Sequence, residues 1–210
     1  MQIAFVLFPG FTSLDIVGPF EMLAKLPDTE SVFVAERTGE YRNEDGQLAL
    51  VADRTLREVS RPDIVVVPGG PGQADQMDNQ VLLDWLREVD AHSTWTTSVC
   101  TGSLLLAAAG LLTGRTATSH WLALDELTAR GVRATGRRVV TDGKYVTAAG
   151  VSSGIDMGLL LAGRVAGDEV AQSIQLLTEY DPQPPYDAGS PEKAPAELVA
   201  QWRARSGASQ

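Results

Sequence analysis

The sequence predicts an α/β fold in which a doubly wound, mostly parallel sheet is sandwiched by helices. Short apolar, β-branched runs alternate with stretches of helical periodicity along most of the chain. Several of these runs are apolar without interruption, as in "DIVVVPGG" (63–70), which is typical of parallel strands covered on both faces. This alternation favours parallel strands joined by helical crossovers.

The apolar runs predict the individual strands, and the helical periodicity predicts the individual helices. Runs bounded by Gly, Pro or polar residues predict strands over 3–8, 32–36, 48–52, 64–67, 94–99, 116–119, 139–141 and 145–148. Apolar residues at helical spacing predict helices over 14–26, 81–91, 102–111, 121–130, 155–165 and 168–178. "DGKY" (142–145) is typical of a hairpin turn, so the last two strands should form an antiparallel addition to the sheet.

The composition changes at the C-terminal end of the chain. "DPQPPYDAGSPEKAP" (181–195) contains five prolines and cannot continue a helix. We expect it to wrap the surface before a short terminal helix over 196–205. With 210 residues and 44% hydrophobic residues, the whole chain, 1–210, is predicted to form a single domain with a sizeable core.

The net charge and the cysteine content limit which partners and which cellular compartment we expect for this chain. The net charge of −10 opposes binding to nucleic acid or to an anionic membrane surface, and favours a small neutral or cationic ligand. The uncharged stretch 93–114 contains too many Ser, Thr and Gly residues for a spanning helix. A single cysteine and a first segment with a strand pattern, "MQIAFVLF", in place of a secretion signal, indicate a cytoplasmic protein.

Three segments of interest follow predicted strands. They are "FPGFTSLD" (8–15), "PGGPG" (68–72) and the only cysteine, Cys100. Because ligands of doubly wound sheets bind outside the carboxyl ends of the strands, we expect these segments to converge on one site.

Cys100 is predicted to stand on a sharp turn between a strand and a helix. There the unpaired N–H groups and the positive field of the helix N-terminus should lower the pKa of the thiol, which would make it a nucleophile. Thr101 and Gly102 are small enough for another backbone segment to approach. The alternative is a buried cysteine that acts as a small hydrophobic residue, but the strand–Cys–Thr–Gly–helix context favours function.

Two acids compete for the role of partner to this thiol. Asp15 lies in the first turn of a predicted helix, where it either complements the helix dipole or faces Cys100 as a general acid and base. Glu21 is the alternative acid, six residues further on.

Backbone N–H groups and histidines are the other candidate groups for the active site. Gly69 and Gly70 form either a tight turn or an anion-stabilising site for the reaction. His120 follows a predicted strand and could reach the crevice, although structural histidines are commoner, and His92 ends a helix, where a structural role is favoured. One Cys and two separated His supply too few ligands for zinc, and no G-x-G-x-x-G follows a strand, so neither a metal nor a nucleotide cofactor is expected.

Four segments together resemble the ThiJ/PfpI superfamily over nearly the whole chain. They are "VLFPGFTSLDIVGPFEML" (6–23), "DIVVVPGGPG" (63–72), "SVCTGSLLLAAAGLLTGRTATSHW" (98–121) and "AAGVSSGIDMGLLL" (148–161). The resemblance implies a flavodoxin-like or class I glutamine-amidotransferase-like sandwich with a nucleophile-elbow cysteine. It also implies a homodimer with the active site near the subunit interface.

Within the superfamily these motifs are shared by isonitrile hydratases and by the sensor domains of AraC-type regulators. "TEYDPQPPYDAGSP" (178–191) is similar to a segment of the hydratases. The chain leaves no room for a pair of helix-turn-helix motifs, and its acidity fits poorly with DNA binding. The resemblance therefore favours a cofactor-independent hydration of isonitriles to N-substituted formamides through a covalent thioimidate.

The resemblance also assigns roles to particular residues. It implies that Cys100 is the nucleophile, that Asp15 is its acidic partner, and that the N–H groups of Gly70 and Thr101 stabilise an anion. Thr101 stands where proteases of the superfamily have a histidine, which disfavours peptidase activity, and His120 stands where many members have a histidine near the pocket. Two alternatives stay open: a glyoxalase-like enzyme acting on 2-oxoaldehydes, and a non-catalytic sensor that binds a ligand or is oxidised at Cys100.

Overall fold

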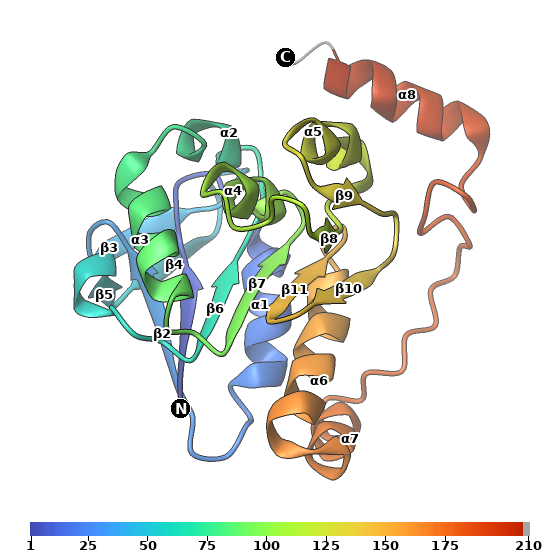
Figure 1. Cartoon of the computed structure of the whole chain (residues 1–210). Coiled ribbons are helices and arrows are strands. Elements are labelled where there is room, and N and C mark those ends of the chain that lie inside the picture. The colour runs from blue at the N-terminus through green and yellow to red at the C-terminus, as the bar shows by residue number, and fades with distance from the viewer. Residues whose placement is uncertain (208–210) are drawn as a thin grey trace.

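The computed structural model describes residues 1–207 and contains a seven-stranded sheet between two layers of helices (Figure 1). The strand order is β10-β11-β7-β6-β1-β2-β5, and every neighbouring pair is parallel except the β10–β11 hairpin. The strands are β1 (Gln2–Val6), β2 (Glu30–Ala35), β5 (Arg54–Thr55), β6 (Ile64–Val67), β7 (Trp95–Val99), β10 (Val139–Asp142) and β11 (Tyr145–Ala148). The predicted doubly wound, mostly parallel sandwich is confirmed, and so is its hairpin.

Helices cover both faces of this sheet. On one face α1 (Ser13–Leu23) packs against α6 (Ser153–Ala166), which is followed by α7 (Asp168–Leu177); the other face carries α3 (Gln80–Asp90) and α4 (Gly102–Ala108) (Figure 1). All four residues of β6 are fully buried, as their uninterrupted apolar run requires. The chain reverses its winding direction between β1 and β6, where ligands of doubly wound sheets bind. The loops that leave these two strands contact each other here: the N–H of Thr12 donates to the carbonyl of Gly69 (2.9 Å).

Two predicted strands lie outside the main sheet. The strand predicted over 48–52 is β4 (Ala49–Ala52), which pairs antiparallel with β3 (Gly39–Arg42) in a separate hairpin. The strand predicted over 116–119 shrinks to β8 (Thr116–Ala117), paired with β9 (Arg133–Ala134). It ends there because the N–H of Thr118 donates to the Thr147 side chain, which ends the strand ladder.

Several predicted helices have different ends. The helices predicted over 14–26 and 102–111 end at Leu23 and Ala108, and Gly110 adopts a positive φ of 82° after the second. The helix predicted over 121–130 is divided into a 3₁₀ turn, η2 (Trp121–Ala123), and α5 (Leu124–Ala129). The short α2 (Gln73–Gln76) and η1 (Leu56–Glu58) were not predicted, because one turn is too short to show a periodicity.

The C-terminal segment leaves the sandwich after α7. Residues 181–195 contain no helix or strand, and they lead to α8 (Ala196–Gly207), which lies on the side of α5 (Figure 1). The guanidinium carbon of Arg203 lies 5.9 Å from the centre of the Trp121 ring. Within the described part of the chain, no helix is both long and apolar enough to cross a membrane.

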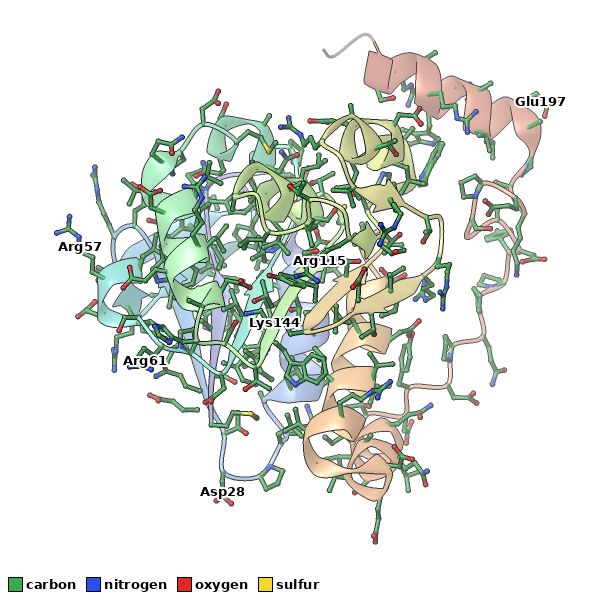
Figure 2. The ribbon with its side chains drawn as sticks, viewed as in Figure 1. Asp28, Arg57, Arg61, Arg115, Lys144 and Glu197 are labelled. Atoms are coloured by element: carbon green, nitrogen blue, oxygen red, sulfur yellow. The ribbon has the colours of Figure 1, made fainter. Side chains whose placement is uncertain are left out.

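A buried polar cluster joins α3 to the amino ends of β7 and β11. The carboxylate of Asp90 accepts hydrogen bonds from Tyr145 (2.9 Å) and Thr96 (2.6 Å) and forms an ion pair with Lys144 (3.1 Å). Burial and the hydrogen bond to Asp90 raise the pKa of Tyr145 to about 12. Lys144 and Arg115, labelled in Figure 2, both lie over the Tyr145 ring. The cluster lies at the amino ends of the strands, on the opposite side of the sheet from the turn that carries Cys100, which indicates a structural role.

Replacing Asp90 with alanine is expected to lower the free energy of unfolding by about 3 kcal/mol, because the Tyr145, Thr96 and Lys144 groups lose their shared acceptor. Urea unfolding followed by circular dichroism measures this. Asp84→Ala is the matched control: Asp84 pairs with Arg87 on the surface, so its loss should change stability by less than about 0.5 kcal/mol. Equal effects of the two substitutions would contradict a stabilising role for the cluster.

Candidate active site

Cys100 stands on a sharp turn between β7 and α4 with a positive φ of 57°. This region is uncommon for any residue other than glycine, and the surroundings hold it in place. The N–H of Cys100 donates to the carbonyls of Ala148 (3.1 Å) and Ala149 (2.9 Å) at the end of β11. The carbonyl of Cys100 accepts from the hydroxyls of Ser103 (3.3 Å) and Ser119 (3.1 Å). The backbone N–H and the carbonyl of Cys100 are thus both fixed, and the predicted elbow is present.

The elbow can form because two glycines let backbones touch. A Cβ placed on Gly102 would lie 2.2 Å from the Val67 carbonyl oxygen, and one on Gly69 would lie 2.5 Å from the Thr101 nitrogen. Both distances are far inside van der Waals contact. The loop after β6 therefore packs directly against the turn that carries Cys100.

Gly102→Ala is expected to lower the free energy of unfolding by at least about 3 kcal/mol, because the new methyl group collides with the backbone of β6 rather than with a side chain that can rotate. Gly136→Ala is the control, since a Cβ there meets no atom within 4 Å. Thermal unfolding of both variants tests this. A Gly102→Ala protein as stable as the control would show that the elbow tolerates a wider spacing.

Asp15 lies fully buried in the first turn of α1 and points toward the elbow loops. Its Oδ2 accepts a 2.8 Å hydrogen bond from the N–H of Gly69, 54 residues away in the chain. Its Oδ1 is also buried, and none of the residues described here lies in hydrogen-bonding geometry with it. A simple capping role for Asp15 is therefore wrong. The competing acid, Glu21, is on the surface in an ion pair with Lys25 (2.8 Å).

Burial raises the pKa of Asp15 from 3.8 to about 7. The Gly69 hydrogen bond and the Cys100 side chain act in the opposite direction, and the charge of Glu44 adds to the increase. Asp15 can therefore gain and lose a proton near neutral pH, as a general acid and base must.

The expected low pKa of the Cys100 thiol is wrong for this buried site. Burial, with only 6% of the residue exposed, and the charge of Asp15 raise its pKa to about 12. The N–H groups of Val151 and Thr101 lower it, but by less. The helix N-terminus is visible in the sequence, whereas the desolvation of the thiol and the neighbouring carboxylate depend on the tertiary structure.

Asp15 and Cys100 consequently titrate as a pair. Between pH about 7 and about 12 the pair holds one proton, and the largest share of it resides on sulfur. Such a pair can move its proton from the thiol to the carboxylate when an electrophile reaches the sulfur. The arrangement is suited to adding S–H across a reactive bond, a nucleophilic step coupled to a proton transfer.

The predicted anion-stabilising groups are close to the elbow but engaged. The N–H of Gly70 donates to the hydroxyl of Thr101 (3.1 Å), so it is not free to meet an anion in this arrangement. The N–H of Thr101 acts on the Cys100 sulfur. The N–H of Gly69 donates to the Asp15 carboxyl group, so it is not available to an anion formed from a substrate.

His120 lies at the edge of the site. Its Nδ1 accepts from the N–H of Leu122 (3.3 Å), and its ring covers Gly150, where a Cβ would be 2.8 Å from Cδ2. Burial lowers the pKa of His120, so the ring is neutral at physiological pH. His92 contacts Arg61 on the surface, consistent with its structural assignment.

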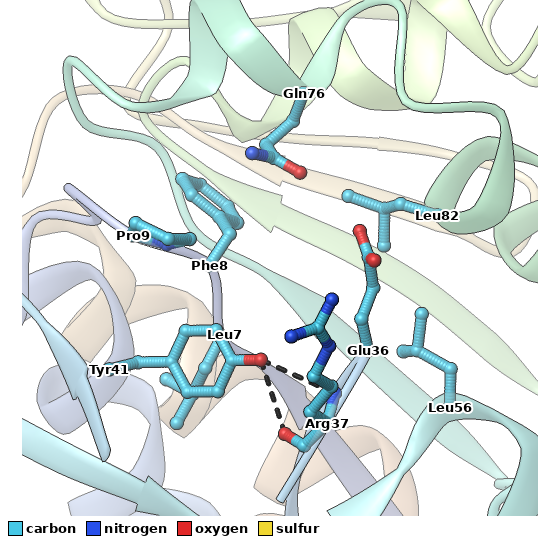
Figure 3. Close-up of a pocket in the computed structure, with 9 residues that line it drawn as sticks. All are labelled: Leu7, Phe8, Pro9, Glu36, Arg37, Tyr41, Leu56, Gln76 and Leu82. Carbon is cyan, nitrogen blue, oxygen red and sulfur yellow. Dashed lines mark hydrogen bonds between the residues drawn. The ribbon is translucent and has the colours of Figure 1, made fainter. Parts of the chain in front are cut away.

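Two cavities lie near the carboxyl edge of the sheet. One, of about 430 Å³, borders the elbow and is discussed below. The other, of about 270 Å³, is at the ends of β1 and β2 (Figure 3) and is lined by Leu7, Phe8, Pro9, Glu36, Arg37, Tyr41, Leu56, Gln76 and Leu82. None of the predicted site residues lines this second cavity. In residues 1–207 no group of three or more His, Cys, Asp or Glu could hold a metal ion.

Several contributors to the site were not predicted, among them Val151, Glu44 and Ser119. Val151, with a positive φ of 30°, presents its N–H to the sulfur; Glu44 acts on Asp15 through its charge; Ser119 binds the Cys100 carbonyl. Val151 and Ser119 fall within segments that carry the family resemblance, which is the signal that marks them. Glu44 has no such signal, because it arrives through the β3–β4 hairpin, where its N–H bonds to the carbonyl of Phe11.

Comparison with known proteins agrees with this geometry. A model of the DJ-1/PfpI family matches residues 1–163. An isonitrile hydratase from Pseudomonas putida is 41% identical over 206 residues, covering 98% of this chain and 90% of that protein. A helix-turn-helix transcriptional regulator from Pseudomonas aeruginosa is 28% identical, but only 52% of its length is matched. The crystal structure of a ThiJ/PfpI family protein from Pseudomonas syringae superimposes with a TM-score of 0.93 at 37% identity, covering 96% of this chain and 84% of that one.

Proposed function

Because the chain belongs to the DJ-1/PfpI family, we propose that the elbow is used for the hydration of isonitriles, R–N≡C, to N-substituted formamides. The similarity to an isonitrile hydratase extends over nearly the full length of both chains. The observation that carries the chemistry is the buried Asp15–Cys100 pair, which shares one proton at neutral pH. An isonitrile carbon accepts both a nucleophile and a proton, and this pair supplies both.

In the first step Asp15 removes the proton from the Cys100 thiol as the sulfur attacks the terminal carbon of the isonitrile. Asp15 then delivers that proton to the same carbon. The C–S and C–H bonds form, the carbon–nitrogen triple bond becomes a double bond, and the product is the thioimidate R–N=CH–S–Cys100. Asp15 returns to the carboxylate form.

In the second step water attacks the thioimidate carbon. Asp15 accepts a proton from the water and delivers it to the nitrogen, which leaves R–NH–CH(OH)–S–Cys100 and the Asp15 carboxylate. The C–S bond then breaks, the proton of the carbinol hydroxyl passes to the sulfur, and R–NH–CHO leaves. The sum is one isonitrile and one water converted to one formamide, with the thiol and the carboxylate restored.

The roles of the remaining predicted residues follow from their positions. We propose that Thr101 acts by directing its N–H to the sulfur, so that negative charge on sulfur is stabilised during attack and release. Rotation of the Thr101 hydroxyl would free the N–H of Gly70 for the developing charge on the substrate. His120, neutral and packed on Gly150, helps to shape the site.

The direct test is to incubate the purified protein with cyclohexyl isonitrile and to follow formation of N-cyclohexylformamide by NMR. We expect catalytic turnover, together with a thioimidate adduct on Cys100 that is detected by mass spectrometry after rapid acid quench. Consumption of methylglyoxal without isonitrile turnover would replace the proposal with a glyoxalase-like activity. Absence of both turnovers, with peroxide oxidation confined to Cys100, would replace it with a sensor.

We further propose that the chain acts as a single domain in a cytoplasmic homodimer. The ThiJ/PfpI resemblance supports the dimer, as do Leu176 and Leu177 at the end of α7, which are 79% and 73% exposed. Light scattering coupled to gel filtration gives the mass in solution.

A further inference from the structure

The cavity of about 430 Å³ beside the elbow is formed between two distant parts of the chain. One wall consists of residues 119–121 and 149–152, three of which contact Cys100. The opposite wall consists of residues 189–192 and Arg203, from the segment that follows α7. The volume lies within the range of small-molecule sites, about 300–1,000 Å³.

The first wall is the backbone that holds the nucleophile. The N–H of Val151 acts on the Cys100 sulfur, the carbonyl of Ala149 accepts from the Cys100 N–H, and the hydroxyl of Ser119 binds the Cys100 carbonyl. Each of these three residues also lines the cavity. Cys100 and Asp15 do not themselves line the cavity, so a substrate attached to the sulfur reaches this space past these three residues.

The lining suits an uncharged substituent. Trp121, Leu124, Val151 and Pro191 present apolar surface to the cavity. Of the charged groups that line it, the guanidinium of Arg138 is bound to the Asp156 carboxylate and that of Arg203 lies over the Trp121 ring. The Glu192 carboxylate accepts hydrogen bonds from its own backbone N–H and from the Ser190 side chain. A neutral ring-sized group would contact the apolar surface without displacing any of these contacts.

The second wall comes from outside the region that the family model matches. That model covers residues 1–163, whereas Gly189, Pro191 and Arg203 lie beyond it. The chemistry-bearing elbow is thus within the part shared across the family, and the wall facing it is supplied by an additional segment. This division is what is expected when a common reaction centre is given a particular substrate preference.

We infer that this cavity is the subsite for the substituent R, and that the segment after α7 selects isonitriles carrying a ring-sized apolar group. This inference rests on the proposed function. Because the C–N≡C axis is linear, an isonitrile whose carbon meets the Cys100 sulfur must direct R away from the sulfur along that axis. Residues 189–192 and Trp121 then contact R and not the reacting carbon, so they set specificity without taking part in bond formation.

Two glycines that line the cavity, Gly136 and Gly189, allow a sharp test. A Cβ on Gly136 or on Gly189 meets no atom within 4 Å, and neither residue has a positive φ, so a larger side chain should be tolerated. Gly136→Leu and Gly189→Leu each reduce the space available to R. Arg137→Leu, at an exposed neighbour that does not line the cavity, is the matched control.

The measured quantity is the ratio of kcat/KM for cyclohexyl isonitrile to kcat/KM for methyl isonitrile. We expect both glycine variants to lower this ratio at least tenfold, mainly through a higher KM for the cyclohexyl substrate, and Arg137→Leu to keep it within twofold. A ratio that stays unchanged in both glycine variants would overturn the inference. So would an equal loss with the two substrates, which would indicate a disturbed elbow.

A binding measurement separates this inference from the proposed reaction. N-cyclohexylformamide is titrated into Cys100→Ser protein, with and without Gly136→Leu, by isothermal calorimetry. The protein with both Cys100→Ser and Gly136→Leu should bind N-cyclohexylformamide at least tenfold more weakly than the protein with Cys100→Ser alone. Equal affinity of the two proteins would refute the subsite. If the wild-type protein fails to hydrate methyl isonitrile, it is the proposed function that fails, whatever the titration shows about the cavity.

Discussion

Cys100→Ala is expected to reduce kcat/KM for isonitrile hydration by at least about 10⁴-fold, the largest effect of any single substitution. Alanine has neither a nucleophile nor a proton to share with Asp15, so the thioimidate cannot form. What remains is binding in the adjacent cavity and attack by water that Asp15 activates, and neither replaces a covalent route. Formamide production at saturating and at low substrate concentrations measures kcat and KM separately.

The control for Cys100→Ala is structural. Cys100 is buried at a positive φ of 57°, and alanine meets the same backbone restriction as cysteine, so the free energy of unfolding should change by no more than about 1 kcal/mol. The substitution Ser103→Ala leaves the sulfur in place and removes one hydrogen bond to the Cys100 carbonyl. It should therefore retain far more activity than Cys100→Ala. Comparable activity of Cys100→Ala and wild type would exclude covalent catalysis at the elbow.

Asp15→Asn is expected to lower kcat by about 10²- to 10⁴-fold and to abolish the pH dependence assigned to the pair. In the wild-type protein the reactive form has one proton on the pair, so kcat/KM should rise as the pH increases through about 7, the pKa of Asp15. Asparagine neither accepts the thiol proton nor titrates. A pH–rate profile from pH 5 to 9 tests this: a variant that keeps the same rise would show that another group is the base.

The same substitution should stabilise the protein above pH 7. The pKa of Asp15 is raised from 3.8 to about 7 in the folded state, so folding favours the protonated acid, and stability falls as the pH rises from about 4 to about 7. A shift of about 3 pKa units corresponds to about 4 kcal/mol as an upper value. The amide oxygen of the introduced asparagine would still accept the Gly69 hydrogen bond, and the variant has no charge to bury.

Urea unfolding of wild type and Asp15→Asn at pH 4 and pH 8 measures this difference. The variant should be the more stable protein at pH 8, and its advantage should shrink at pH 4, where the wild-type carboxyl is largely protonated in the folded state and about half protonated in the unfolded state. A pH-independent difference would mean that the ionisation of Asp15 is not what destabilises the site. A gain in stability together with a loss of activity is typical of a residue retained for function.

Much of the fold and part of the site are readable from the local pattern of residues. Uninterrupted apolar runs such as β6 can only be buried on both faces, and "DGKY" specifies a hairpin turn, so the parallel sheet and its antiparallel edge were both predicted. The elbow at Cys100 follows in the same way, since a strand and a helix joined by Cys-Thr-Gly leave little room for another geometry. The strands at 48–52 and 116–119 pair outside the main sheet, which the local pattern does not reveal, because the choice of partner for a short strand depends on edges that are distant in sequence.

By itself, then, the sequence determined most of the strands and helices, and that the segments containing Asp15, Gly69 and Cys100 converge at the carboxyl edge of the sheet, because periodicity is a local property and the ends of parallel strands lie at one edge. Only the tertiary structure decided the protonation of that site. The pKa values of Asp15 and Cys100 depend on how deeply the two groups are buried and on charges such as Glu44, which reaches them through a separate hairpin. The tertiary structure likewise placed residues 189–192 opposite Val151, since a proline-rich segment has no periodicity that would fix where it packs.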